Sequence, residues 1–176
     1  KTWRRNKVAL YWEGEPGDTR TLSYSDLYRE TNMFASVLKN LGVEKGDRVA
    51  LYLPMVPELP IFMLACARLG TPHTVIFSGF SPSALADRVN DTQAKVLVTA
   101  DGGFRRGKAI KLKEIVDETL TKTPSIESVI VVRRVGVEVN MKDGRDFWLQ
   151  DLLKDAKLYV KPESIESTHP LYILYT

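Results

Sequence analysis

The sequence predicts an α/β fold in which βαβ units build a mostly parallel sheet covered by helices. Three observations support this fold class: short apolar runs typical of buried strands, intervening segments of helical periodicity, and Gly or Pro where one kind of segment gives way to the other. The chain has 176 residues, 44% hydrophobic and 27% charged, which excludes disordered and collagen-like classes and is enough for one sizeable core.

The chain is expected to begin with a hairpin followed by a helix. Residues 8–12 and 19–22 are strand-like and flank a stretch dense in turn-forming residues. Ser23 and Asp26 have the spacing of a capping box, in which each residue satisfies a backbone N–H of the other. We therefore expect a helix to start there, with its apolar residues on one face and Gly42 as its stop signal.

The middle of the chain alternates between strand and helix patterns. Each expected strand is a short apolar run, and each expected helix is bounded by a capping residue, a Pro in its first turn or a terminal Gly. The expected strands cover residues 48–53, 74–77, 95–99 and 128–132, and the expected helices cover residues 58–69, 82–90 and 110–120. Strands and helices in this order favour parallel pairing, because antiparallel hairpins need no intervening helix.

The pattern weakens toward the end of the chain. Residues 135–139 are a candidate strand that pairs with a neighbour across a turn at 142–144, and residues 148–153 are a candidate short helix. The polar stretch 162–170 is expected to be a connecting loop. Residues 171–176 have the character of a buried strand, and because a chain rarely stops on such a strand we expect the sequence to be a fragment.

Charge and cysteine content restrict the expected partners. The formal net charge of +3 is too small to predict binding to nucleic acid or to a membrane surface, so an anion site must be local. Cys66 cannot form an internal disulfide, and together with His73 and His169 it makes neither a metal site nor a catalytic triad. A single cysteine and the lack of a signal peptide fit a reducing, cytoplasmic compartment.

The strongest candidate site follows the expected strand 95–99. Ligands of open α/β sheets bind at the carboxyl ends of the strands, and here several cations lie among glycines directly before a helix. Cations at a helix N-terminus cost up to about 1 kcal/mol each unless an anion is present, so this segment predicts a phosphate site of free N–H groups and flexible glycines. The alternative is a solvated basic loop. Its cations are Arg105, Arg106, Lys108, Lys111 and Lys113, and its glycines are Gly102, Gly103 and Gly107.

A second candidate loop follows the expected strand 74–77. Gly79 permits close approach of the backbone to a ligand, and Phe77 and Phe80 offer flat rings for stacking. The alternative is a capped helix start with two core aromatic residues. Neither the dinucleotide fingerprint nor the P-loop motif occurs in the sequence.

Several ordered motifs resemble the AMP-forming acyl-CoA synthetases of the adenylate-forming superfamily. Residues 22–27 resemble the first core motif of that family, and residues 64–70 resemble the second. Residues 12–15, 75–81 and 99–108 resemble the acetyl-CoA synthetase branch in particular. The resemblance covers nearly the whole chain, and several motifs in order are far more specific than any one of them.

The resemblance implies a ligase that activates acetate or a similar short-chain carboxylate with Mg-ATP to acyl-AMP, then transfers the acyl group to CoA. Residues 1–176 would be the N-terminal portion of its large AMP-binding domain, cut before the ATP phosphate loop that should begin at Thr176. This portion would supply scaffold and part of the CoA nucleotide site, contain no catalytic residue or metal ligand, and be inactive alone. A free-standing, non-catalytic α/β nucleotide-binding or interaction module is the alternative.

The resemblance also implies which residues contact CoA. Arg105 falls on the first CoA-binding arginine of the branch, and Lys108 falls where a second arginine is common, so the charge is kept but the planar fork is lost. Ser78 replaces a usual glycine in the loop on the adenine side. The implied CoA-binding residues are Phe77, Ser78, Gly79, Arg105, Arg106, Gly107 and Lys108.

Overall fold

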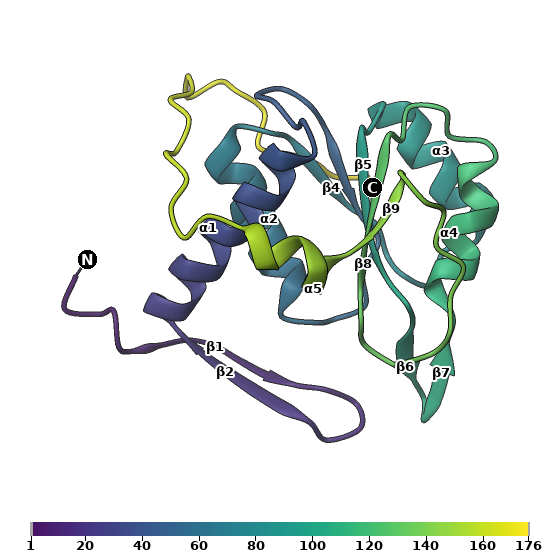
Figure 1. The fold of residues 1–176 in the computed structure, drawn as a ribbon, viewed down its shortest axis with the longest axis horizontal. Coiled ribbons are helices and arrows are strands. Elements are labelled where there is room, and N and C mark those ends of the chain that lie inside the picture. The colour runs from purple at the N-terminus through teal and green to yellow at the C-terminus, as the bar shows by residue number, and fades with distance from the viewer. Residues whose placement is uncertain (1, 176) are drawn as a thin grey trace.

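The computed structural model describes residues 2–175 and contains a six-stranded sheet at its centre (Figure 1). The strands are β3 (Val49–Leu51), β4 (His73–Val75), β5 (Val96–Ala100), β8 (Ser128–Val132), β9 (Asp146–Trp148) and β10 (Tyr172–Ile173). Their spatial order is β10-β4-β3-β5-β8-β9, and every neighbouring pair is parallel. The predicted α/β class with a parallel sheet is confirmed.

Helices cover both faces of this sheet (Figure 1). The four longer helices are α1 (Tyr24–Asn40), α2 (Glu58–Leu69), α3 (Pro82–Thr92) and α4 (Leu112–Leu120). The first two pack against each other on one face, and the last two pack against each other on the other face. The short helix α5 (Leu149–Leu152) continues into a 3₁₀ turn that contacts α1. Among residues 2–175, no helix has the length and apolar character needed to cross a membrane.

The helix ends follow the signals in the sequence. Asp26 N–H donates to Ser23 Oγ, and Ser23 N–H donates to Asp26 Oδ2, both at 3.1 Å, so the predicted capping box is formed. Gly70 ends α2 with a φ of +64°, a left-handed conformation that costs glycine little because it has no Cβ. Ser81 and Pro82 begin α3 as expected, although this helix runs two residues past residue 90, to Thr92.

The core explains why the central strands are continuous apolar runs. Every residue of β3, β5 and β8 is buried, because helices cover both faces of the sheet. On the α1–α2 face, the rings of Phe34 and Phe62 pack with their centroids 4.6 Å apart. Strands buried on both faces show no alternation of polar and apolar residues. Their short length and the Gly and Pro residues that flank them are therefore the signals that identify them in the sequence.

Two hairpins lie outside the central sheet, and the sequence predicted one of them. Strands β1 (Val8–Glu13) and β2 (Thr19–Ser23) pair in antiparallel fashion as expected. The second hairpin, β6 (Gly103–Arg105) with β7 (Lys108–Ile110), occupies the segment expected to be a flexible loop. The helix expected over 110–120 consequently starts at Leu112.

The expected pairing of residues 135–139 across a turn at 142–144 is wrong. Residues 135–139 form no strand, and β9 joins the sheet beside β8 in parallel orientation. The physical cause is Asp101, whose buried carboxylate accepts hydrogen bonds from the N–H groups of Arg134, Val135 and Gly136 at 2.7 to 3.0 Å. These bonds fix the chain after β8 in a turn. The short helix expected over 148–153 is confirmed by α5.

The end of the chain is less buried than the sequence suggested. The polar loop over 162–170 is confirmed. The strand expected over 171–176 is reduced to β10, which pairs with β4 at the edge of the sheet and leaves Tyr172 57% exposed. Within residues 2–175, this strand is therefore largely exposed despite its apolar sequence. Thr176, where the phosphate loop was expected to begin, lies outside the described residues.

Candidate functional site

A pocket of about 290 Å³ opens at the carboxyl ends of the central strands. The loop after β3, the loop after β4 and the β6–β7 hairpin after β5 line it, and the β1–β2 turn closes one side. Strand β3 connects to α2 on one face, whereas β4 and β5 connect to α3 and α4 on the other face (Figure 1). Connections that diverge in this way leave a crevice, which is where ligands bind in open α/β sheets.

Arg105 and Phe77 face each other in this pocket. The guanidinium carbon of Arg105 lies 5.6 Å from the centroid of the Phe77 ring, within the range of a cation–π contact. The Phe77 ring packs edge-on against Phe80 at 5.7 Å and is itself exposed. Within residues 2–175, Arg105 forms no salt bridge, whereas the nearby cations Lys111 and Arg134 each do. The structure thus brings together a flat ring and a cation without an acidic partner.

Gly79 permits the close packing of two side chains around it. A Cβ placed there would lie 2.9 Å from Arg105 Nη1 and 2.9 Å from Cζ of Phe77, closer than real Cβ contacts. The backbone φ of Gly79 is not positive, so a side chain there would meet no backbone strain but would displace the ends of Phe77 and Arg105. Gly79 therefore allows the Phe77 ring and the Arg105 guanidinium to lie over the same stretch of backbone.

Tyr52 holds the loop after β4 by hydrogen bonds, a role that the sequence did not reveal. Its buried hydroxyl lies 3.0 Å from the carbonyl oxygens of both Ser78 and Phe80, to which it donates. Burial raises the pKa of Tyr52 to about 12, so the hydroxyl stays protonated and remains a donor at neutral pH. The available signal was its position directly after β3, at the carboxyl edge of the sheet.

The β6–β7 hairpin holds two cations side by side. Arg106 and Gly107 form its turn with φ values of +52° and +72°, the pattern of a type I′ turn. Arg105 and Lys108 are directly opposite each other in the ladder, where Cβ atoms of paired residues are about 5 Å apart and like charges repel. An anion beside this pair would relieve the repulsion. Arg105 lines the pocket, whereas Arg106, Gly107 and Lys108 lie outside its lining and are exposed.

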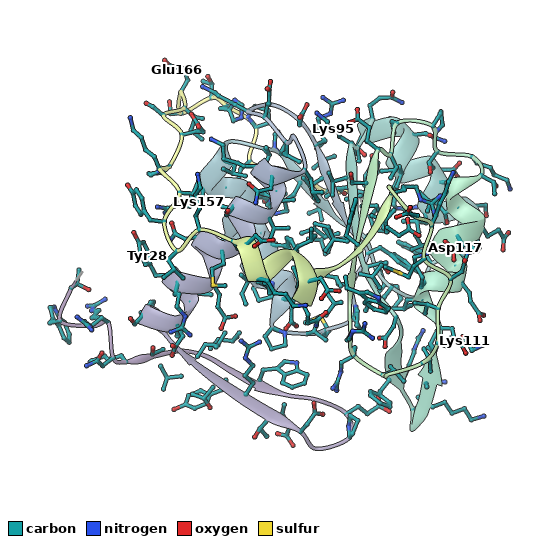
Figure 2. All side chains as sticks on the ribbon, viewed as in Figure 1. Tyr28, Lys95, Lys111, Asp117, Lys157 and Glu166 are labelled. Carbon is teal, nitrogen blue, oxygen red and sulfur yellow. The ribbon has the colours of Figure 1, made fainter. Side chains whose placement is uncertain are left out.

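Two of the cations expected at the anion site are used elsewhere. Lys111, which lies at the hairpin end of α4 in Figure 2, forms a salt bridge with Glu114 at 2.7 Å. Lys113 is buried, with its Nζ 2.9 Å from Asp146 Oδ2 and 2.6 Å from Asp117 Oδ1. Burial with two carboxylates therefore takes Lys113 away from the hairpin, whereas the charge of Lys111 is balanced by an exposed carboxylate.

The turn of the hairpin is also less free than expected. The N–H of Gly107 donates to the carboxylate of Glu15, which belongs to the turn between β1 and β2. The segment is thus an ordered hairpin whose turn N–H is occupied, and the expected flexible loop with free N–H groups is not formed.

Arg134 ties the two hairpins together and lines the pocket. Its guanidinium makes two hydrogen bonds to Asp18, at 2.6 and 3.0 Å, and lies 4.9 Å from the Trp12 ring centroid and 5.0 Å from that of Phe104. The hydrogen bond from Arg134 holds the pKa of Asp18 below its ordinary value. Sequence reasoning missed Arg134, although its place just after the buried strand β8 was a usable signal.

Parallel strands, helices on both faces and a pocket at the strand carboxyl ends define an open α/β domain with a crevice where ligands of such sheets bind. The family model for the AMP-binding enzyme matches residues 1–176, and the chain belongs to this family.

The proteins similar to this chain include acetyl-CoA synthetases. The acetyl-coenzyme A synthetase of Methanothrix thermoacetophila is 56% identical over 177 residues, which cover 100% of this chain and 27% of that protein. The one from Rubrobacter xylanophilus is 58% identical over 174 residues, which cover 98% of this chain and 27% of that protein. The chain therefore spans about 27% of the length of these relatives.

A solved structure supports the same assignment. Acetoacetyl-CoA synthetase from Streptomyces lividans superposes with a TM-score of 0.89 at 29% sequence identity, over 98% of this chain and 26% of that one. The fold of residues 2–175 is thus similar to part of an acyl-CoA synthetase.

Proposed function

We propose that this chain is the N-terminal portion of the large AMP-binding domain of an acid–CoA ligase. The ligase would activate acetate or a similar short-chain carboxylate with Mg-ATP to acyl-AMP and transfer the acyl group to CoA. Identity of 56% to an acetyl-coenzyme A synthetase over 100% of the chain supports this assignment. The single cysteine supports a reducing compartment, which we take to be the cytoplasm.

Within this ligase, we assign to residues 1–176 the sheet scaffold and part of the site for the nucleotide of CoA. The observation that carries the assignment is the cation Arg105 facing the exposed ring of Phe77 in the pocket, with Lys108 opposite Arg105 in the hairpin. The adenine of CoA has a flat face that stacks on an aromatic ring, and its 3′-phosphate suits a guanidinium and an ammonium held close together. ATP and Mg²⁺ would be held mostly by residues beyond this chain.

The two cations are not equivalent in this proposal. Arg105 lines the pocket and presents a planar fork that can bind two phosphate oxygens at once. Lys108 is exposed and supplies a single charge on a flexible stem. Arg106 and Gly107, at the turn, would raise the local potential and fix the hairpin geometry. We therefore expect Arg105 to matter more than Lys108.

Calorimetry on the full-length protein with CoA and with 3′-dephospho-CoA tests the assignment. Arg105→Gln should weaken CoA binding about 10- to 100-fold, the value of charge-assisted hydrogen bonds, and leave 3′-dephospho-CoA nearly unaffected. Lys108→Gln should have the same selectivity with a smaller effect. Lys111→Gln is the matched control, because Lys111 belongs to the same segment but is paired with Glu114. Equal affinity of the wild-type protein for both ligands would contradict the phosphate role.

A second experiment tests the expected division of labour along the chain. Acetate-dependent exchange between ATP and pyrophosphate should be present in the full-length protein and absent from residues 1–176 alone. Robust exchange by the segment alone would show that the catalytic groups lie within it, and the proposal would then be wrong.

A further inference from the structure

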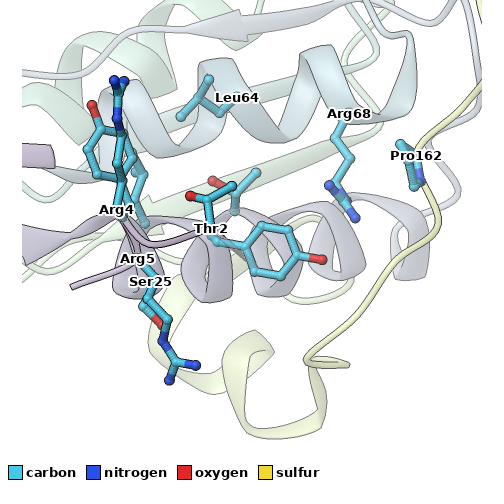
Figure 3. A pocket seen from close by; sticks show the side chains of 11 residues that line it. Thr2, Arg4, Arg5, Ser25, Leu64, Arg68 and Pro162 are labelled. Carbon is cyan, nitrogen blue, oxygen red and sulfur yellow. The ribbon is translucent and has the colours of Figure 1, made fainter. Parts of the chain in front are cut away.

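A second and larger pocket, of about 740 Å³, lies between α1, α2 and the N-terminal segment (Figure 3). It shares no lining residue with the pocket at the strand ends. Tyr28 of this pocket and Lys111 beside the β6–β7 hairpin lie on opposite sides of the molecule in Figure 2. A volume of this size is in the range of pockets that bind small organic molecules.

Arg68 is held in place at one end of this pocket. Its Nε donates to the carbonyl oxygen of Val160 at 2.7 Å, and its guanidinium lies 5.4 Å from the Tyr28 ring centroid and 5.6 Å from that of Tyr159. Within residues 2–175, Arg68 has no carboxylate partner. The hydrogen bond and the two rings restrain the side chain but use only one of its five N–H groups, so the outer edge can still bind an anion.

The walls next to Arg68 are apolar and exposed. Tyr24, Tyr28 and Leu64 line the pocket and are 51%, 46% and 43% exposed, so an apolar body placed there would bury surface that now faces water. Figure 3 shows Leu64 between Arg68 at one end and Arg4 at the other.

All charged side chains described in the pocket lining are positive. Its described lining residues include Arg4, Arg5 and Arg68 and no acidic residue. The segment that carries the first two is anchored on α1, because Ser25 N–H donates to the Arg5 carbonyl at 2.9 Å. An apolar wall with cations at both ends is complementary to an organic anion and not to a neutral or cationic molecule.

We propose that this pocket binds a small organic anion with a flat apolar body. The anionic group lies against the outer edge of the Arg68 guanidinium, and the apolar body lies on Tyr28 and Leu64. Carboxylates and phosphates share the chemistry that Arg68 recognises. The site is independent of the proposed CoA site, because the two pockets have no residue in common.

Calorimetry with 1-naphthyl phosphate on the full-length protein tests the proposal. 1-Naphthoate compares the carboxylate with the phosphate head group, while 1-naphthol and inorganic phosphate each lack one half of the ligand. Naphthyl phosphate, naphthoate or both should bind at least about tenfold more tightly than either half, because only they use both the cation and the apolar wall. Saturating CoA should not displace the probe.

Variants locate the binding. Arg68→Gln should weaken binding of whichever naphthyl anion binds by about tenfold or more. Leu64→Ser should weaken it only about threefold, because Leu64 is already partly exposed. Lys157→Gln is the control, since it removes an equal charge from an exposed position outside the pocket lining. If Arg68→Gln lowers the melting temperature through loss of the Val160 contact, the probe affinity of Leu64→Ser alone is used to test the proposal. Unchanged binding in Leu64→Ser, equal binding of 1-naphthol, or displacement by CoA would overturn the proposal.

Discussion

The carboxylate of Glu15 accepts a hydrogen bond from the backbone N–H of Gly107, so the turn of one hairpin touches the turn of the other. Glu15 thereby places a negative charge next to the three cations of the β6–β7 hairpin, Arg105, Arg106 and Lys108. An incoming phosphate would meet both these cations and the Glu15 carboxylate. Glu15 holds the hairpin in place and at the same time opposes binding of an anion.

Replacing Glu15 by Gln should increase the affinity for CoA about two- to fivefold. The amide oxygen can still accept from Gly107, while the exposed charge, worth up to about 1 kcal/mol against a phosphate, is removed. Calorimetry at low and high salt checks this, because the gain should shrink as salt screens the charge. Glu166→Gln, at an exposed site far from the hairpin in Figure 2, is the control. A lower affinity of Glu15→Gln would mean that positioning of the hairpin outweighs repulsion.

Gly79→Ala should weaken CoA binding about tenfold with little change in overall stability. The new Cβ would lie 2.9 Å from Arg105 Nη1, so the exposed ends of the Arg105 and Phe77 side chains must move apart, which costs the fold little but removes their shared placement in the pocket. Calorimetry with CoA, together with a thermal melt, separates lost binding from lost folding.

Ser83→Ala is the matched control for Gly79→Ala. It lies four residues further on, in the first turn of α3, is exposed and outside the pocket lining, and the change adds no Cβ, so CoA affinity should stay within about twofold of the wild type. If both variants bind CoA as the wild-type protein does, the arrangement of Phe77 over Gly79 has no part in CoA binding.

The sequence revealed those parts of the fold that depend on local signals. The capping box of Ser23 and Asp26 and the left-handed Gly70 act within a few residues, and the central strands have lengths and flanking breakers that mark them as strands. The β6–β7 hairpin was missed because its strands have three residues each, too few for a period, and because Arg106 is not a typical residue for a positive φ.

The candidate site shows the same division between local and distant causes. Position at strand carboxyl ends was enough to select the loops that contain Phe77 and Arg105. Pairing of charges was not predictable, because Lys113 meets Asp146, which is 33 positions further along the chain, and Gly107 meets Glu15, which is 92 positions away. A run of cations in a sequence does not show which of them already have partners.

Asp146→Asn should destabilise the protein by about 2–3 kcal/mol, because the buried ammonium of Lys113 loses its fully buried counterion and keeps only the partly exposed Asp117. Urea unfolding near neutral pH measures this loss. Asp151→Asn is the control, since it breaks an exposed pair with Lys154 and should cost less than about 1 kcal/mol. If both variants lower the unfolding free energy by a similar small amount, the buried pair stabilises the fold no more than the exposed pair does.

Asp146→Asn should also make the unfolding free energy less dependent on pH in acid. Burial opposes ionisation of Asp146, but hydrogen bonds from the Arg145 guanidinium, the Lys142 N–H and the Lys113 ammonium hold its pKa below the ordinary 3.8. A carboxylate with a lowered pKa stabilises the fold fully above its unfolded pKa, and this contribution is lost as the pH falls through the folded value. The difference between wild type and Asp146→Asn should therefore narrow below about pH 4.

His73 should make the protein less stable in mild acid. The side chain is 3% exposed, neither ring nitrogen has a hydrogen-bond partner among the described residues, and burial lowers the pKa of the imidazole from 6.5. A histidine with a lowered pKa favours folding above its unfolded pKa, and that contribution is lost as the pH falls toward the folded value. The unfolding free energy should then fall by up to about 1.4 kcal/mol per pH unit below about pH 6.5.

Replacement of His73 tests whether this ring causes the loss. His73→Leu removes the titration, so its unfolding free energy should depend less on pH between about 7 and 5 than that of the wild type. His169→Gln is the control, because it removes the other histidine, which is only partly buried and contacts the Gly70 carbonyl oxygen. If the unfolding free energies of the wild type and His73→Leu depend equally on pH, protonation of His73 does not cause the loss of stability in acid. A reduced slope in His169→Gln alone would assign the acid sensitivity to the loop that carries His169.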